Sequence, residues 1–238
     1  MKILLICVLM AVLAGGRAQT VIRPGDKLIR ADLIKPSHDY YKNVTTDTTG
    51  KILYEFMMED VTTIDTARGR IVFARSRQVP LGYFSMDTSI TDFSLKPISM
   101  HEVHVQYAVS FDMSFDDTLA TVTSSRKGKT TVKQYPMKPG YFEDNMIEYI
   151  FGALQLKKGV LYTLDNFNKD TPTPSDPYTV EYIFDDVWVL APGQTIDCLV
   201  FHYTHGGTDG HIWIDKSTHQ MLKQEGFFKK GRYVITKV

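Results

Sequence analysis

The segment that decides the fold covers residues 103–115, which have the sequence VHVQYAVSFDMSF. Apolar side chains occupy every second position of this segment: Val103, Val105, Tyr107, Val109, Phe111, Met113 and Phe115. Period two over this length is typical of a long β-strand with one buried face. We therefore expect a single strand over residues 103–115, with these apolar side chains facing the protein interior.

The same alternation recurs along the chain, at residues 52–58, at Ile71 and Phe73, and at residues 182–188. Further segments rich in β-branched and aromatic residues lie at 118–124, 129–135, 159–166, 195–204, 210–215, 219–225 and 231–238. Turn residues separate them, as in Lys127-Gly128, Gly206-Gly207 and Asp209-Gly210. The pattern predicts many short antiparallel strands joined by hairpins, and a surface loop at the three prolines of residues 171–177.

One amphipathic helix is predicted over residues 144–154. Ile147, Ile150, Phe151 and Leu154 follow helical spacing, after the acidic residues Glu143 and Asp144. A sheet this apolar must cover its concave face, and this helix is the natural cover. The expected fold is mainly β: a single curled antiparallel sheet, a half-barrel or open barrel, with one short amphipathic helix covering the concave face, all in one domain of residues 19–238.

The N-terminus has the pattern of a secretory signal peptide over residues 1–18. Lys2 precedes an apolar stretch of about 11 residues, and Gly16 and Ala18 follow at signal-peptidase spacing. A bilayer-spanning helix needs roughly 20 residues, so no membrane-spanning segment is expected. No Cys lies at the cleavage point, and we expect a soluble periplasmic protein that begins near Gln19.

Charge and cysteine content narrow the class further. Without residues 1–18, 25 basic residues face 27 acidic ones, so no basic field is available for a nucleic-acid partner. Only Cys198 remains, within an apolar segment, and no intramolecular disulfide can form. We expect a monomer stabilised by packing, with Cys198 as a small buried hydrophobe.

The histidines are the remaining candidates for chemistry. His101 and His104 would lie on opposite faces of a strand, whereas a Gly-rich hairpin could bring His205 and His211 together near His202. No carboxylate completes a metal site at the usual spacing, and no Gly-x-Ser-x-Gly elbow accompanies His205-Gly206-Gly207. The sequence therefore predicts no catalytic residue, no metal and no cofactor.

The aromatic content leaves two alternatives open. The chain has 13 Tyr, 13 Phe and 2 Trp, which could fill an ordinary core or surround an apolar cavity inside a curled sheet. The residues expected to line such a cavity are Val105, Tyr107, Val109, Phe111, Ile147, Phe151 and Trp188.

Two C-terminal runs, residues 195–202 and 210–225, carry a family resemblance, supported by Tyr83 to Ser89, residues 95–97 and residues 144–159 in the same order. The chain resembles an uncharacterised family of exported bacterial proteins, classed as a domain of unknown function. Such proteins are similar in architecture to the periplasmic lipoprotein carriers. Over residues 40–238, the resemblance implies an envelope role and a lipid-like ligand, and supplies no catalytic residues.

Three functions follow in order of preference. The first is a non-catalytic periplasmic binding or carrier protein for an amphipathic, lipid-like ligand, whose helix packs loosely enough that Phe151→Ala costs less than a core aromatic usually does. The second is a structural or interaction protein of the cell envelope with a solid core and an envelope protein or glycan as partner. The third is a secreted hydrolase that uses His202, His205 and His211.

Overall fold

The computed structural model describes residues 20–78, 84–137, 140–169 and 177–238. The predicted signal peptide, its cleavage site, Tyr83 and residues 171–176 of the proline-containing loop lie outside these ranges. No helix in the described ranges is long and apolar enough to span a membrane.

A single 15-stranded sheet dominates the fold, in the order β1-β11-β13-β14-β15-β16-β17-β2-β3-β4-β5-β6-β7-β8-β9. Its strands are β1 (Thr20–Ile22), β2 (Ser37–Asp47), β3 (Ile52–Asp65), β4 (Arg70–Gln78), β5 (Phe84–Asp92), β6 (Pro97–His104), β7 (Val109–Phe115), β8 (Leu119–Arg126), β9 (Lys129–Pro136), β11 (Leu161–Leu164), β13 (Tyr178–Ala191), β14 (Gln194–His205), β15 (Thr208–Asp215), β16 (Met221–Phe228) and β17 (Gly231–Lys237). Two further strands, β10 (Phe142–Glu143) and β12 (Asn166–Phe167), form a separate parallel pair.

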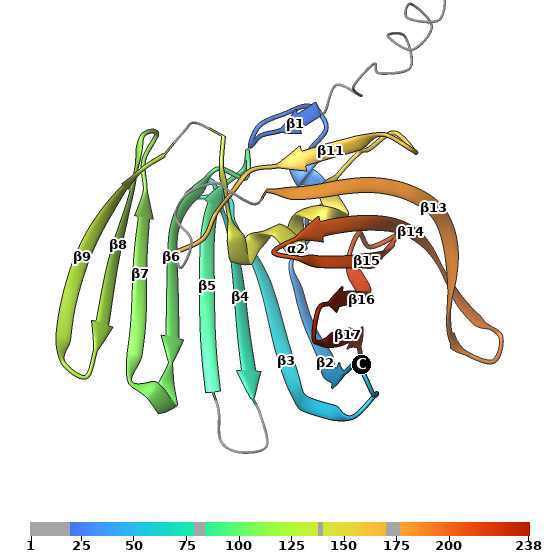
Figure 1. Ribbon diagram of the computed structural model, residues 1–238. Helices are drawn as coiled ribbons and strands as arrows, with labels where there is room; N and C mark the ends of the chain where they lie inside the picture. Colours follow the sequence, from blue (N-terminus) through green and yellow to red (C-terminus); the bar gives the residue numbers. More distant parts are fainter. Residues whose placement is uncertain (1–19, 79–83, 138–139, 170–176) are drawn as a thin grey trace, which may run out of the picture.

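The sheet curls without closing, because β1 and β9 end it as separate edges. Strands β2–β9 form one half and β13–β17 the other, with α2 between them (Figure 1). The pairing of β17 with β2 joins the halves, and only β1 with β11 is a parallel pair within this sheet. The predicted mainly β, open-barrel fold is confirmed, with that parallel pair as its one departure from antiparallel order.

The predicted helix is also confirmed, as three short consecutive pieces: η3 (Asp144–Met146), α2 (Ile147–Ile150) and η4 (Phe151–Ala153). Its apolar side chains are fully buried, and the Phe151 ring lies 5.9 Å from Phe201 and 6.0 Å from Tyr203, both on β14. Two other 3-10 turns are η1 (Ala31–Leu33) and η2 (Val105–Tyr107). The helix thus covers the concave face and forms the centre of the main core.

Residues 103–115 are not one strand, and this prediction is wrong. Strand β6 ends at His104, η2 turns the chain, and Ala108 adopts a left-handed φ of 48° before β7 returns antiparallel to β6. The alternation continues across the turn by coincidence of composition, because apolar residues at a hairpin tip look the same as strand residues. Val105 and Tyr107 are therefore 57% and 59% exposed instead of facing the interior.

This correction predicts opposite outcomes for two aspartate substitutions. Met113 on β7 is buried, so Met113→Asp should prevent stable folding, since an unpaired buried carboxylate costs several kcal/mol against a total of roughly 5–15. Val105→Asp at the exposed tip should change the free energy of unfolding by less than about 1 kcal/mol. Urea denaturation measures both changes. Equal losses of free energy of unfolding at the two positions would support one continuous strand over residues 103–115.

The hairpin turns follow from glycine placement in most cases. Gly206 and Gly207 both have positive φ and connect the paired residues His205 and Thr208, as a two-residue type I′ turn requires. Asp209-Gly210 is not a turn, since both residues lie within β15 and pair with Thr204 and Tyr203 of β14. A Cβ on Gly210 would lie 2.8 Å from the Tyr203 ring, so close packing explains this glycine.

A smaller core lies on the opposite face of β14 from Phe201 and Tyr203. It contains Cys198, Val200, Trp213 and Leu222, with Trp188 packed beside them. Cys198 is fully buried, as expected of a small hydrophobe, and burial raises the pKa of its thiol. Trp188 therefore faces away from the helix and from the interior of the curl.

Candidate functional site

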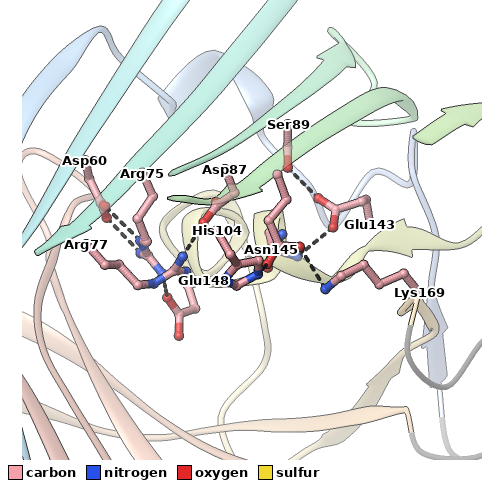
Figure 2. Close-up of polar contacts among 11 residues, drawn as sticks. Asp60, Arg75, Arg77, Asp87, Ser89, His104, Glu143, Asn145, Glu148 and Lys169 are labelled. Carbon is pink, nitrogen blue, oxygen red and sulfur yellow. Dashed lines mark hydrogen bonds and ion pairs between the residues drawn. The ribbon is translucent and has the colours of Figure 1, made fainter. Parts of the chain in front are cut away.

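Charged side chains cross the concave face of the sheet in one row. The register places Asp60 of β3 opposite Arg75 of β4, Arg75 opposite Asp87 of β5, and Asp87 opposite Glu102 of β6. Directly opposed residues share a face, so all four point into the curl. They are buried there, and Figure 2 shows the labelled members of this group directed toward the helix segment.

Arg75 is the most fully bonded member of the row. Its Nε and Nη2 donate to the two carboxylate oxygens of Asp60, each at 2.7 Å, and its Nη1 donates to Glu148 Oε2 at 2.5 Å. Burial is the largest influence on the pKa of Glu148 and would raise it, but the charge and hydrogen bond of Arg75, together with the charge of Arg77, hold that pKa below its usual value. The pair joins the sheet to α2.

Arg77 lies two residues further along β4 and is bonded differently. Its side chain is 24% exposed, and its Nη1 donates to Asp87 Oδ2. Burial raises the pKa of Asp87 although the charge of Arg77 opposes this change. Arg77 is therefore paired with a carboxylate that its surroundings hold in an unfavourable charged state.

The row continues on the β6 side with Glu102. Its carboxylate lies 2.6 Å from His104 Nε2 and 2.7 Å from Lys169 Nζ, and the ammonium of Lys169 also lies 4.9 Å from the centre of the Phe111 ring. Glu102 thus links β6 to the segment that follows β12.

Two acids at the start of the helix fasten it to both halves of the sheet. Glu143 accepts hydrogen bonds from Ser89 Oγ of β5 and from the Asn145 backbone N–H. Asp144 accepts from Asn166 Nδ2 at 2.6 Å and lies 3.7 Å from His205 Nε2 of β14. The helix is therefore held by polar contacts as well as by its apolar face.

Glu143 should make the protein less stable as pH rises. Burial raises its pKa to about 8 from 4.5, so the folded state keeps a proton that the unfolded chain loses between those two values. Between these two pKa values, each pH unit lowers the free energy of unfolding by about 1.4 kcal/mol. Glu143→Gln mimics the protonated acid, so its free energy of unfolding should match that of the wild type near pH 4.5 and exceed it by several kcal/mol at pH 8.5.

Urea unfolding across this pH range tests the effect, and the difference between variant and wild type removes the contribution of every other group. Glu55→Gln, which removes an exposed carboxylate that is paired with Lys42 on the surface, is the matched control. If the difference in free energy of unfolding between Glu143→Gln and the wild type does not change with pH, the folded protein does not hold Glu143 as a buried neutral acid.

An open cavity of about 290 Å³ adjoins the charged row. Its lining has an apolar part, Phe56, Met58 and Ile235, and a charged part, Arg75, Arg77 and Glu148; Asn43, Thr45 and Tyr233 complete it. Arg75 and Glu148 also border a smaller cavity of about 50 Å³ beside Tyr149 and His219. The larger space approaches the lower end of the range for ligand pockets, roughly 300–1,000 Å³, and offers both an apolar and a charged surface.

The seven residues predicted to line a cavity do not come together. Val105 and Tyr107 are exposed at the β6–β7 tip, Val109 is half-buried at the start of β7, and Trp188 packs on the other face of the sheet. Phe111 packs with the cluster that contains Met113, and Ile147 and Phe151 are enclosed in the main core. None of the seven lines the 290 Å³ cavity.

The histidines also separate. His202 and His211 are paired residues on one face of β14 and β15, with ring centres 5.4 Å apart, whereas His205 lies three residues from His202 on the other face and stacks on Tyr178. The hairpin therefore brings His211 to His202 and not to His205. His101 bonds to exposed Asp112 and His104 to buried Glu102, so these two occupy opposite faces as predicted. In the described part of the chain, no group of three or more His, Cys, Asp or Glu side chains could hold a metal ion.

Comparison with known proteins gives a family and a similar fold. A family model described as "Protein of unknown function (DUF3108)" matches residues 40–236. No curated protein matches the chain. Among solved structures, the chain is similar to a beta-barrel-like protein of the domain of unknown function DUF1849 from Brucella abortus, with a TM-score of 0.55 over 88% of this chain and 97% of that one. At 12% sequence identity, this similarity shows a barrel-like fold alone.

Proposed function

The chain belongs to the DUF3108 family of proteins of unknown function, and from this premise we propose that it is a non-catalytic binding or carrier protein for an amphipathic, lipid-like ligand. The ligand occupies the 290 Å³ cavity of the open sheet. The signal peptide expected at residues 1–18 supports a site of action in the bacterial periplasm.

The observation that carries the proposal is the mixed apolar and charged lining of this cavity. Phe56, Met58 and Ile235 offer apolar surface, whose removal from water on binding an alkyl chain contributes about 25 cal/mol per Å². Arg75 and Arg77 on the neighbouring strand β4, and Glu148 on α2, add charge to the same lining. An amphiphile matches both the apolar and the charged part of the lining, whereas a purely polar or purely apolar molecule leaves one of them unmatched.

Binding of a fluorescent amphiphile tests the proposal. A dansyl-labelled undecanoic acid should bind the purified protein with a rise in emission, and Phe56→Asp should weaken binding at least tenfold by placing a charge in the apolar part of the lining. Val132, which is exposed on the distant strand β9, supplies the control: Val132→Asp should bind as the wild type does. Absence of binding to the wild type, or equal binding to Phe56→Asp, would refute the proposal.

The tight packing of the helix favours the alternative of an envelope structural or interaction protein. Ile147, Ile150 and Phe151 are enclosed in the main core, and large apolar side chains are exposed elsewhere, including Tyr54 on β3 and Val189 and Leu190 on β13. Such residues could contact a protein partner. This function becomes the preferred one if no amphiphile binds.

A further inference from the structure

We propose that the polar end of the ligand is an anion and that Arg77 binds it, with the alkyl chain directed along β3 toward the open end of the cavity. This inference rests on the proposed function and adds the charge and orientation of the ligand.

The two arginines of the cavity differ in how many acceptors they have. Arg75 uses Nε, Nη1 and Nη2 for its bonds to Asp60 and Glu148, and its side chain is only 6% exposed. Arg77 uses Nη1 alone, for Asp87, and no other carboxylate or carbonyl in the described ranges accepts from it. A guanidinium has five N–H donors arranged to hold an oxyanion through two bonds. Arg77 is therefore the group with donors to offer a ligand.

The neighbouring carboxylates do not prevent Arg77 from binding an anion. Glu148 also lines the cavity, but its carboxylate already accepts a hydrogen bond from Arg75. Asp87 lies outside the lining, is buried, and stands opposite Glu102, whose negative charge opposes its own. Because Asp87 accepts from Nη1 alone, a ligand anion can bind the other donors of Arg77 while Asp87 keeps its counter-ion.

The strand register gives the orientation. Met58 lies directly opposite Arg77, and Phe56, two residues away on the same face of β3, lies in a row with Asn43 and Ile235. In the other direction, the row of Asp60, Arg75 and Asp87 follows Met58. The concave face thus changes from apolar to charged along β3, with Arg77 at the boundary. Tyr54, 64% exposed, continues the apolar side beyond Phe56. An anion at Arg77 leaves its alkyl chain over Met58 and Phe56.

Four amphiphiles with the same 12-carbon chain test the inference: dodecanoate, dodecyl phosphate, dodecylammonium and nonionic dodecyl maltoside, each below its critical micelle concentration in displacement of the dansyl probe. Both anions should bind at least tenfold more tightly than the other two. A preference between dodecanoate and dodecyl phosphate then identifies the source of the anion as a carboxylate or a phosphate.

Substitutions of Arg77 and of Asp87 should change the affinity for anionic amphiphiles in opposite directions. Arg77→Gln should lower the affinity for the anions at least tenfold and leave dodecyl maltoside unchanged. Asp87→Asn, which releases Arg77 from its counter-ion, should raise the anion affinity severalfold. The double variant Arg77→Gln/Asp87→Asn removes both charges, and should lack anion selectivity even if Arg77→Gln alone does not fold. Arg126→Gln, at an exposed position on β8, is the matched control and should behave as the wild type.

The outcomes distinguish the two proposals. Equal affinity for all four amphiphiles, or tightest binding of dodecylammonium, overturns the anion assignment and leaves the proposed function standing. Persistence of anion selectivity in the double variant overturns the role of Arg77. Failure of every amphiphile to bind the wild type overturns the proposed function itself.

Discussion

Arg75→Met should lower the free energy of unfolding by about 3–5 kcal/mol, the usual result of breaking a buried ion pair from one side. The substitution leaves Asp60 and Glu148 as two carboxylates without their shared cation, and the side chain of Asp60 is only 5% exposed. Because total stability is roughly 5–15 kcal/mol, this loss should be visible as a large shift of the urea midpoint.

A compensated variant separates the charge effect from lost packing. Asp60→Asn/Arg75→Met/Glu148→Gln removes all three charges together, and should recover much of the lost stability because no unpaired charge remains buried. Arg68→Met, at an exposed position with a surface ion pair to Asp65, should cost less than about 1 kcal/mol. A similarly small cost for Arg75→Met would show that the charged row does not hold the helix to the sheet.

Phe151→Ala should cost about 3–5 kcal/mol, the value for a well-packed core aromatic. The side chain is 2% exposed and packs against Phe201 and Tyr203. The sequence led us to expect a smaller loss, because a loosely packed helix would leave an apolar hollow beneath it. The structure places the cavity beside the charged row instead, so Phe151→Ala should destabilise the fold strongly.

Thermal and urea unfolding measure the loss, with Phe93→Ala as the control, since Phe93 is 46% exposed in the turn after β5. The control should change the free energy of unfolding by less than about 1 kcal/mol. A loss at Phe151 no larger than that of the control would mean that the helix is a loose cover after all.

Apolar periodicity was sufficient to predict the sheet and the helix, because these elements depend on which side chains avoid water. It was insufficient wherever apolar residues serve another purpose. Val105 and Tyr107 continue the alternation of β6 and β7 across a turn, so the sequence pattern conceals the hairpin. Strand β2, with the sequence SHDYYKNVTTD, was missed because its polar residues interrupt the pattern on both faces.

The charged row was missed for a related reason. Ile71 and Phe73 were correctly placed on the interior face, and period two carries the same face to Arg75 and Arg77. Two arginines following two buried apolar residues in phase were the available signal, and the preference for apolar interiors hid it. Their partners are 10 to 73 residues away in the chain, so only the register of the folded sheet brings the site together.

The central claim is that the open cavity holds an amphiphile, and native mass spectrometry of protein purified from its own cell envelope tests it most directly. We predict a bound species of one lipid-like molecule per chain, which is lost when Phe56→Asp is expressed and purified in the same way. A wild-type protein that carries no adduct under conditions that retain known lipid complexes, and that takes up none from envelope lipid extract, would contradict the claim.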